Sequence, residues 1–129
     1  MNLQVNDIKV FVPAKVFERS LAFYKALSWQ QKWLADDKSL AVLELNGSRF
    51  YLQNYYQKDW ANNFMLHIAV EDAHAWWQHV TSILANGNFK PARVSKPKDE
   101  GYAIVTHVWD PSGVLLHFAQ FTHARHNID

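Results

Sequence analysis

Apolar and polar residues alternate along residues 8–12, near the start of the chain. Ile8, Val10 and Val12 occupy every second position, Lys9 and Phe11 lie between them, and a proline follows. Side chains of a strand point alternately to its two faces, so this pattern predicts a strand that ends at the proline. We expect Lys9 and Phe11 to share one face of a sheet and the three aliphatic residues to share the other.

A helix is predicted over residues 16–29. Phe17, Leu21 and Tyr24 recur at the three- to four-residue spacing of one helical face, and Leu27 or Ser28 continues it. The charged residues between them are suited to the solvent-facing side. This strand and helix therefore form the start of an α/β unit.

A hairpin is predicted after a polar turn at residues 35–39. The apolar runs at residues 40–45 and 49–54 flank the dipeptide Asn46-Gly47. Asn-Gly favours the two-residue turn that matches the twist of paired strands, so it is a strong hairpin signal.

The second half of the chain repeats this order of elements. The predicted elements are a strand at residues 64–70, a helix at 73–87, an edge strand at 91–95, a charged loop at 96–101, and strands at 102–109 and 114–121. Glu71-Asp72 cap the helix, and Asn86-Gly87 end it. Asp110-Pro111-Ser112-Gly113 matches a type I turn between the last two strands.

Each half thus reads βαβββ, which predicts an α+β fold built from two modules that form cupped mixed sheets. We expect one domain over residues 1–129, with module one at about 6–57, module two at about 62–121 and a polar tail at 122–129. The run at 53–60, polar and aromatic together, is expected to link the modules or to form a rim.

Composition narrows the class of protein. The 129 residues are 49% hydrophobic and 15% aromatic, which is sufficient for a folded core. The formal net charge of +1 gives no indication of nucleic acid or an anionic membrane as a partner. Because the chain has no cysteine, disulfides and Cys-bound zinc are excluded. With no signal-peptide pattern and no long apolar run, we expect a cytoplasmic protein without a membrane span.

Three histidines fall on strand positions that face away from the helices. If Leu66 and Ile68 pack on a helix, His67 between them must point to the opposite side. The same alternation turns His117 and His107 away from the core. Each of these three strands therefore presents one imidazole to a common face.

Three segments of the chain resemble the vicinal oxygen chelate superfamily. They are VPAKVFERSLAFYKALSW at 12–29, HIAVED at 67–72 and WDPSGVLLHFAQ at 109–120, of which the Asp-Pro-x-Gly turn is the most specific. The superfamily includes glyoxalase I, extradiol dioxygenases, fosfomycin-resistance enzymes and bleomycin-resistance proteins. Val16 departs from the pattern, because many relatives carry Asp near this position.

The resemblance implies two modules that enclose a cavity, often completed by a partner chain, and hence a homodimer. It also implies that the metal ligands of the metalloenzymes would fall on Lys9, a residue near Gln53, His67 and His117. The ammonium group of Lys9 has no lone pair, and Gln53 is a weak neutral donor. His117 stands where the superfamily usually has a glutamate.

Two hypotheses of function follow. The first is a metal-independent protein, similar to bleomycin-resistance proteins, that sequesters a small aromatic or amphipathic molecule and needs no cofactor. The expected ligand-binding residues are Lys9, Phe11, Tyr51, Gln53, His67, His107, Trp109 and His117, and no catalytic residue is assigned. Lys9 would anchor an anionic group of the ligand. Further aromatic candidates for the cavity wall are Trp33, Tyr55, Tyr56 and Trp60.

The alternative is a divalent-metal-dependent lyase, thiol transferase or dioxygenase. It would use His67, His117 and a third ligand, Glu44 or Gln53, to hold Zn, Ni, Mn or Fe. A third possibility is a module for dimerisation or interaction, whose cavity is filled by its own aromatic residues.

The remaining four histidines are expected at the surface. His74 and His79 are five positions apart on one helix and do not form an i, i+4 pair. His123 and His126 lie in the tail.

Overall fold

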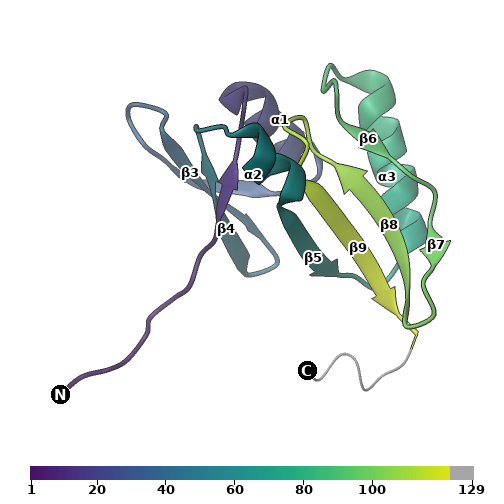
Figure 1. The fold of residues 1–129 in the computed structure, drawn as a ribbon, viewed down its shortest axis with the longest axis horizontal. Coiled ribbons are helices and arrows are strands. Elements are labelled where there is room, and N and C mark those ends of the chain that lie inside the picture. Colours follow the sequence, from purple (N-terminus) through teal and green to yellow (C-terminus); the bar gives the residue numbers. More distant parts are fainter. Residues whose placement is uncertain (123–129) are drawn as a thin grey trace.

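The computed structural model describes residues 1–122, and these form two sheets with three helices. The first half contains β1 (Phe11–Pro13), α1 (Phe17–Ala26), β2 (Gln30–Leu34), β3 (Leu40–Leu45), β4 (Ser48–Gln53) and α2 (Lys58–Asn63). The second contains β5 (Met65–Ala69), α3 (Ala73–Asn86), β6 (Arg93–Val94), β7 (Lys98–Asp99), β8 (Ala103–Trp109) and β9 (Leu115–Phe121). Figure 1 shows the two sheets next to each other, one from each half.

The two modules have the same topology, which confirms the predicted repeat and the α+β class. The first sheet has the strand order β1-β4-β3-β2, and the second has β5-β9-β8-β6, with β7 also paired to β8. In each sheet the first strand of the module runs parallel to the last, and the other pairings are antiparallel.

The hairpin between β3 and β4 turns at Asn46-Gly47, as predicted. Asn46 has φ 51° and Gly47 has φ 89°. Positive φ at both central residues is the conformation that Asn-Gly favours. This turn aligns Val42 with Tyr51 and Glu44 with Arg49 across the two strands.

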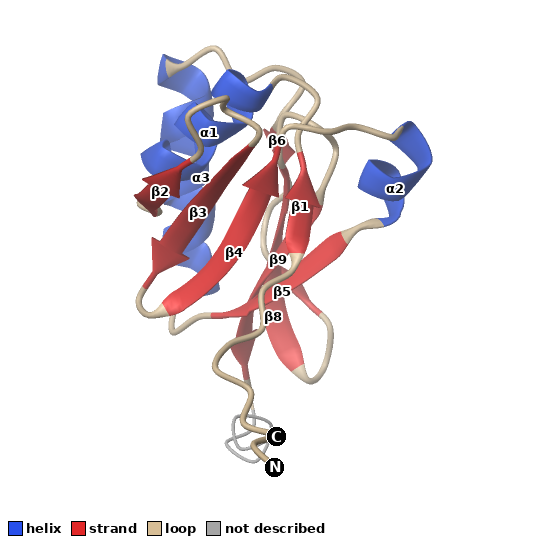
Figure 2. Ribbon diagram, turned by 90° about the vertical axis from the view of Figure 1, so that its left-hand side faces the viewer, coloured by secondary structure: helices blue, strands red, loops and turns tan. Residues whose placement is uncertain are grey.

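One hydrophobic core joins the modules. Figure 2 shows α1 and α3 at the upper left, partly overlapped by β2, with β4, β1 and β5 to their right. The core includes Phe23, Tyr24 and Leu27 of the first half with Leu116 and Phe118 of the second, all fully buried. An edge-to-face contact of Phe23 with Phe89, at 5.6 Å between ring centroids, links the halves further.

The turn at residues 110–113 holds α1 against the second module. The Asp110 carboxylate accepts hydrogen bonds from the backbone N–H of Ser112, at 2.8 Å, and of Val114, at 3.0 Å. The Ser112 hydroxyl lies 3.1 Å from the Ser20 hydroxyl in α1 and accepts from the backbone N–H of Lys15. The most specific segment of the sequence thus forms a contact between the modules.

Three sequence expectations are corrected. The strand predicted at 8–12 begins only at Phe11, because β4 pairs with the chain from that residue onward. Ile8 is therefore 82% exposed and does not enter the core with Val12. The linker contains the helix α2, and the charged loop contains the short strand β7. His123 and His126 lie outside the described residues.

Candidate functional site

The predicted division of the second sheet into two faces is confirmed. Leu116 and Phe118 are fully buried on the helix side, where the Thr106 hydroxyl donates a 2.7 Å hydrogen bond to a carbonyl of α3. The opposite side is called the histidine face here. Its residues are Met65, His67, Ala69, Ala103, Val105, His107, Trp109, Leu115, His117 and Ala119.

Three histidines form a row across adjacent strands of the histidine face. His117 in β9 pairs with His67 in β5 on one side and with His107 in β8 on the other. The ring centroids of His107 and His117 are 4.9 Å apart with the rings nearly perpendicular, and those of His67 and His117 are 6.3 Å apart with the rings nearly parallel. His117 Nε2 also lies 3.3 Å from Met65 Sδ.

The environment of the central histidine of this row favours its neutral form. Partial burial lowers the pKa of His117 below its usual 6.5, and the neighbouring His107 and His67 lower it further, whereas Glu100 opposes them. A neutral imidazole has one N–H donor and one acceptor nitrogen. The row therefore offers hydrogen-bonding groups without a fixed positive charge at its centre.

Aromatic and apolar groups border the histidine row. The Arg93 guanidinium of β6 lies over the Trp109 ring, with Cζ 3.5 Å from the ring centroid. Val105, Ala103 and Ala119 are almost fully buried in a small cluster of their own, against which Phe121 packs. Val105 thus lies on the predicted side, but neighbouring side chains cover it.

The other predicted residues lie on the first sheet and form a second group, called the tyrosine face here. Phe11 and Tyr51 stack at 5.0 Å between ring centroids, and the ammonium of Lys9 is 5.5 Å from the Tyr51 ring centroid. Gln53 lies two positions after Tyr51, on the same side of β4. Lys9 pairs with Asp7, so part of its charge is already neutralised.

The structure places the predicted ligand-binding residues in these two groups and not in one cluster. Among the described residues, the ring contacts and ion pair of the tyrosine face lie within the first module, and the ring contacts of the histidines lie within the second sheet. The two groups come from different sheets of the same chain. A site that contains both therefore requires a further element to bring them together.

The donors expected for a metal do not fit one site in this chain. Glu44 is engaged with Arg49, at 2.6 Å, and with Lys32, at 3.5 Å, and these cations lower its pKa. It belongs to the first sheet, whereas His67 and His117 belong to the second. Within residues 1–122, no group of three or more His, Cys, Asp or Glu residues is arranged to hold a metal ion.

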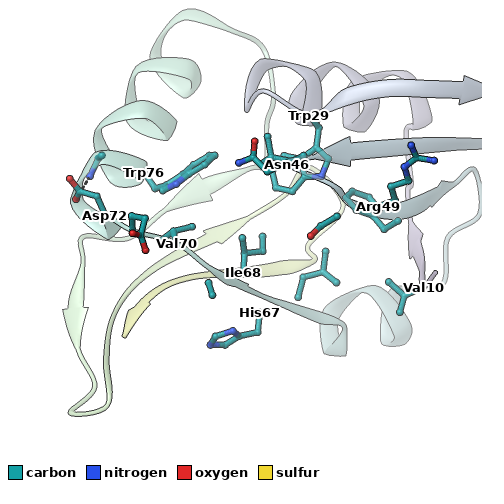
Figure 3. Close-up of a pocket in the computed structure, with 16 residues that line it drawn as sticks. Val10, Trp29, Asn46, Arg49, His67, Ile68, Val70, Asp72 and Trp76 are labelled. Atoms are coloured by element: carbon teal, nitrogen blue, oxygen red, sulfur yellow. Dashed lines mark hydrogen bonds between the residues drawn. The ribbon is translucent and has the colours of Figure 1, made fainter. Parts of the chain in front are cut away.

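A groove of about 720 Å³ lies between the two modules, where the resemblance implied a cavity, but His67 alone of the predicted ligand-binding residues lines it. Its walls are mainly apolar and include Trp29, Leu45, Phe50, Leu66, Ile68 and Trp76. Figure 3 shows Trp29 and Trp76 on either side of it, with Ile68 pointing into the groove and His67 pointing to the other side of β5. Arg49, Glu71 and Asp72 supply charges around it.

The other lining residues were missed because each wall of the groove looks like core in the sequence. Trp29 ends the predicted helix and is only 6% exposed, and Trp76 stacks on Phe118 with 4.5 Å between ring centroids. Helical spacing identifies such residues as packed. It cannot show that two packed faces, one from each module, leave a space where they meet.

Residues 1–10 form an extended N-terminal arm. Figure 1 shows this arm leading away from both sheets. Its apolar side chains are exposed, with Leu3 at 79%, Val5 at 68% and Ile8 at 82%. Val10, at the base of the arm, lines the groove between the modules.

The comparisons with known proteins identify the fold. No protein-family model and no curated protein matches the chain. Solved structures, however, do match the chain. A bleomycin resistance determinant encoded on transposon Tn5 has a TM-score of 0.73 and 18% identity, over 92% of this chain and 100% of that one.

Two further solved structures are similar to this chain in fold. A bleomycin-binding protein from Streptomyces verticillus, complexed with copper(II)-bleomycin, has a TM-score of 0.73 and 16% identity, over 91% of this chain and 98% of that one. A glyoxalase / bleomycin resistance protein from Catenulispora acidiphila has a TM-score of 0.66 and 19% identity, over 88% and 96%. The chain thus has the glyoxalase/bleomycin-resistance fold.

None of the helices in residues 1–122 has the length and apolar character required to cross a membrane.

Proposed function

We propose that this protein binds and sequesters a small, partly aromatic molecule without using a metal. The observation that carries the proposal is the histidine face, where imidazole and indole rings lie side by side on an open sheet surface. Flat rings and a few hydrogen-bonding groups suit the recognition of a planar ligand. Sequestration requires only such contacts.

The ligand-binding residues remain those predicted from the sequence. On the histidine face they are His67, His107, Trp109 and His117, and on the tyrosine face they are Lys9, Phe11, Tyr51 and Gln53. Similarity of fold to proteins described as binding bleomycin supports a ligand of this kind. The chemistry of the exposed side chains, and not the fold, carries the assignment.

The metalloenzyme alternative is less well supported. His67 and His117 would need a third ligand, and Glu44 is occupied by two cations in the other sheet. We therefore derive no step through a metal ion.

Fluorescence titration tests the binding proposal, since Trp109 reports from the site itself. We expect bleomycin or a planar probe such as 2-naphthamide to quench the fluorescence saturably. Trp109→Ala should weaken binding of the quencher by about tenfold, as expected for the loss of one stacking group. Trp77→Ala, on α3, is the matched control and should leave the affinity unchanged. Absence of saturable quenching by every probe would contradict the proposal.

We further propose that the protein acts as a homodimer in which the N-terminal arm of each copy occupies the groove of the other. The arm carries exposed aliphatic side chains, and the walls of the groove are mainly apolar. Apolar surface of this kind is usually covered by a partner. A second copy would also supply the further element that the two separated groups of ligand residues require.

Cysteine cross-linking tests this exchange, because the natural chain has no cysteine. Val5→Cys in one chain and Ala75→Cys in a second chain of different size should form a mixed disulfide on oxidation. Gln78→Cys lies on the same helix outside the groove and is the control, which should cross-link poorly. If a disulfide forms only within a single chain that carries both Val5→Cys and Ala75→Cys, the arm folds back onto its own groove. A solution mass of 15.0 kDa would contradict the dimer.

The cytoplasmic location stays a prediction.

A further inference from the structure

Two cationic side chains occupy strand positions of the histidine face. Arg93 in β6 lies beside Trp109, and Lys98 in β7 is paired with Val105, so its side chain shares that face. The strand positions of this face carry no Asp or Glu. Glu100, just beyond β7, is the acidic group whose field reaches His117.

Arg93 is held in place without being neutralised. Its guanidinium lies over the Trp109 ring at 3.5 Å, and within residues 1–122 no carboxylate forms an ion pair with it. Stacking of this kind covers one face of the guanidinium and leaves the N–H groups along its edge free to donate. Lys9, Lys32, Lys38 and Arg49 have carboxylate partners, whereas Lys98 on the same face, like Arg93, has no ion pair within residues 1–122.

The imidazoles continue this set of donors across the sheet. The ring centroid of His107 is 6.2 Å from that of Trp109 and 4.9 Å from that of His117. A planar ligand lying along this row would contact indole and imidazole rings with its flat part. One end of the ligand would then lie near the guanidinium of Arg93.

We infer that the histidine face selects an aromatic anion, whose carboxylate or phosphate is bound by Arg93 while its ring packs along Trp109, His107 and His117. The planar fork of arginine matches both of these anions. The inference rests on the proposed binding function and narrows it to one class of ligand. It also moves the anion-binding role from Lys9, which Asp7 already neutralises, to Arg93.

Three probes with the same ring system test the inference: 2-naphthoate, 2-naphthamide and 2-naphthylmethylammonium. At low salt we expect naphthoate to bind at least tenfold more tightly than naphthamide, and the cation to bind most weakly. Arg93→Gln should remove the preference for naphthoate and leave the affinity for naphthamide unchanged. Arg93→Lys should restore only part of the preference, because it keeps the charge but not the fork. Lys25→Gln, an exposed cation on α1, is the control for the loss of one charge.

The outcomes separate the two proposals. Equal affinity for naphthoate and naphthamide, or tightest binding of the cation, would overturn the anion assignment while the binding function stands. Failure of all three probes to bind would contradict both. Comparison of 2-naphthoate with 2-naphthyl phosphate then distinguishes a carboxylate ligand from a phosphate ligand.

Discussion

The hydroxyl of Tyr24 in α1 donates a 2.7 Å hydrogen bond to Asp110 Oδ2, in the turn before the last strand. Tyr24 is fully buried and Asp110 has no exposed surface, so the bond crosses from one module to the other inside the core. The same carboxylate accepts two backbone N–H groups of its own turn. This single contact therefore couples the conformation of the turn to the position of α1.

Removing the Tyr24 hydroxyl should destabilise the whole domain. Tyr24→Phe keeps the edge-to-face contacts of the ring but deprives a buried carboxylate of one donor, which costs about 1–3 kcal/mol. Urea unfolding followed by tryptophan fluorescence would measure this loss. Tyr55→Phe removes a hydroxyl with an exposed hydrogen bond and should change stability by less than about 0.5 kcal/mol. Equal effects of the two substitutions would argue against the coupling of the modules through Tyr24.

The stability contributed by Asp110 should depend on pH. Burial raises the pKa of Asp110 from 3.8 to about 6, while the hydrogen bonds from Tyr24, Ser112 and Val114 oppose this rise. The folded state then binds a proton more tightly than the unfolded chain. The stability that this raised pKa contributes is complete below pH 3.8 and is lost as the pH rises through about 6.

Asp110→Asn isolates this effect, because its amide has a similar shape and does not titrate. The stability of the wild type relative to Asp110→Asn should fall by about 3 kcal/mol between pH 3.5 and pH 7, from a shift of about two pKa units. Urea unfolding of both proteins across this range gives the difference. A constant difference would mean that folding does not shift the pKa of Asp110, and a difference that grows with pH would mean that folding lowers it.

Gly47 should be required for its backbone conformation and not for space. It has φ +89°, and a Cβ at this position would meet no atom within 4 Å. Gly47→Ala should therefore destabilise the hairpin by about 1 kcal/mol through the cost of the left-handed conformation alone. Thermal unfolding measures this cost, with Ser48→Ala as the exposed control next to it. A change of several kcal/mol would indicate a contact that the structure does not contain.

The sequence predicted the fold well because its signals are local. Asn46-Gly47, the capping residue Asp72 and the turn at 110–113 each specify a conformation within a few residues. Strict alternation in β5 and β9 then fixed which side of the second sheet carries the histidines. The strand at 8–12 was predicted too long because alternation cannot show where a partner strand begins.

The candidate site was predicted less completely because it depends on distant contacts. The row of His67, His117 and His107 follows from register, which the sequence suggested through strand faces. The stacking of Arg93 on Trp109 needs the pairing of a two-residue strand, for which there is no strong sequence pattern. The groove between Trp29 and Trp76 requires the relative position of two modules, which no local pattern contains.

Removal of divalent metal should leave ligand binding unchanged. The histidine face can stack and donate hydrogen bonds through its imidazoles, and neither role needs an ion. Protein dialysed against EDTA and protein supplied with Zn²⁺ should therefore bind 2-naphthamide with affinities within about twofold of each other. Elemental analysis after dialysis against equimolar Zn²⁺ should give the same metal content for the wild type and for His67→Ala combined with His117→Ala. One ion per chain that disappears in the double variant would favour the metalloenzyme alternative and direct the search toward lyase and dioxygenase substrates.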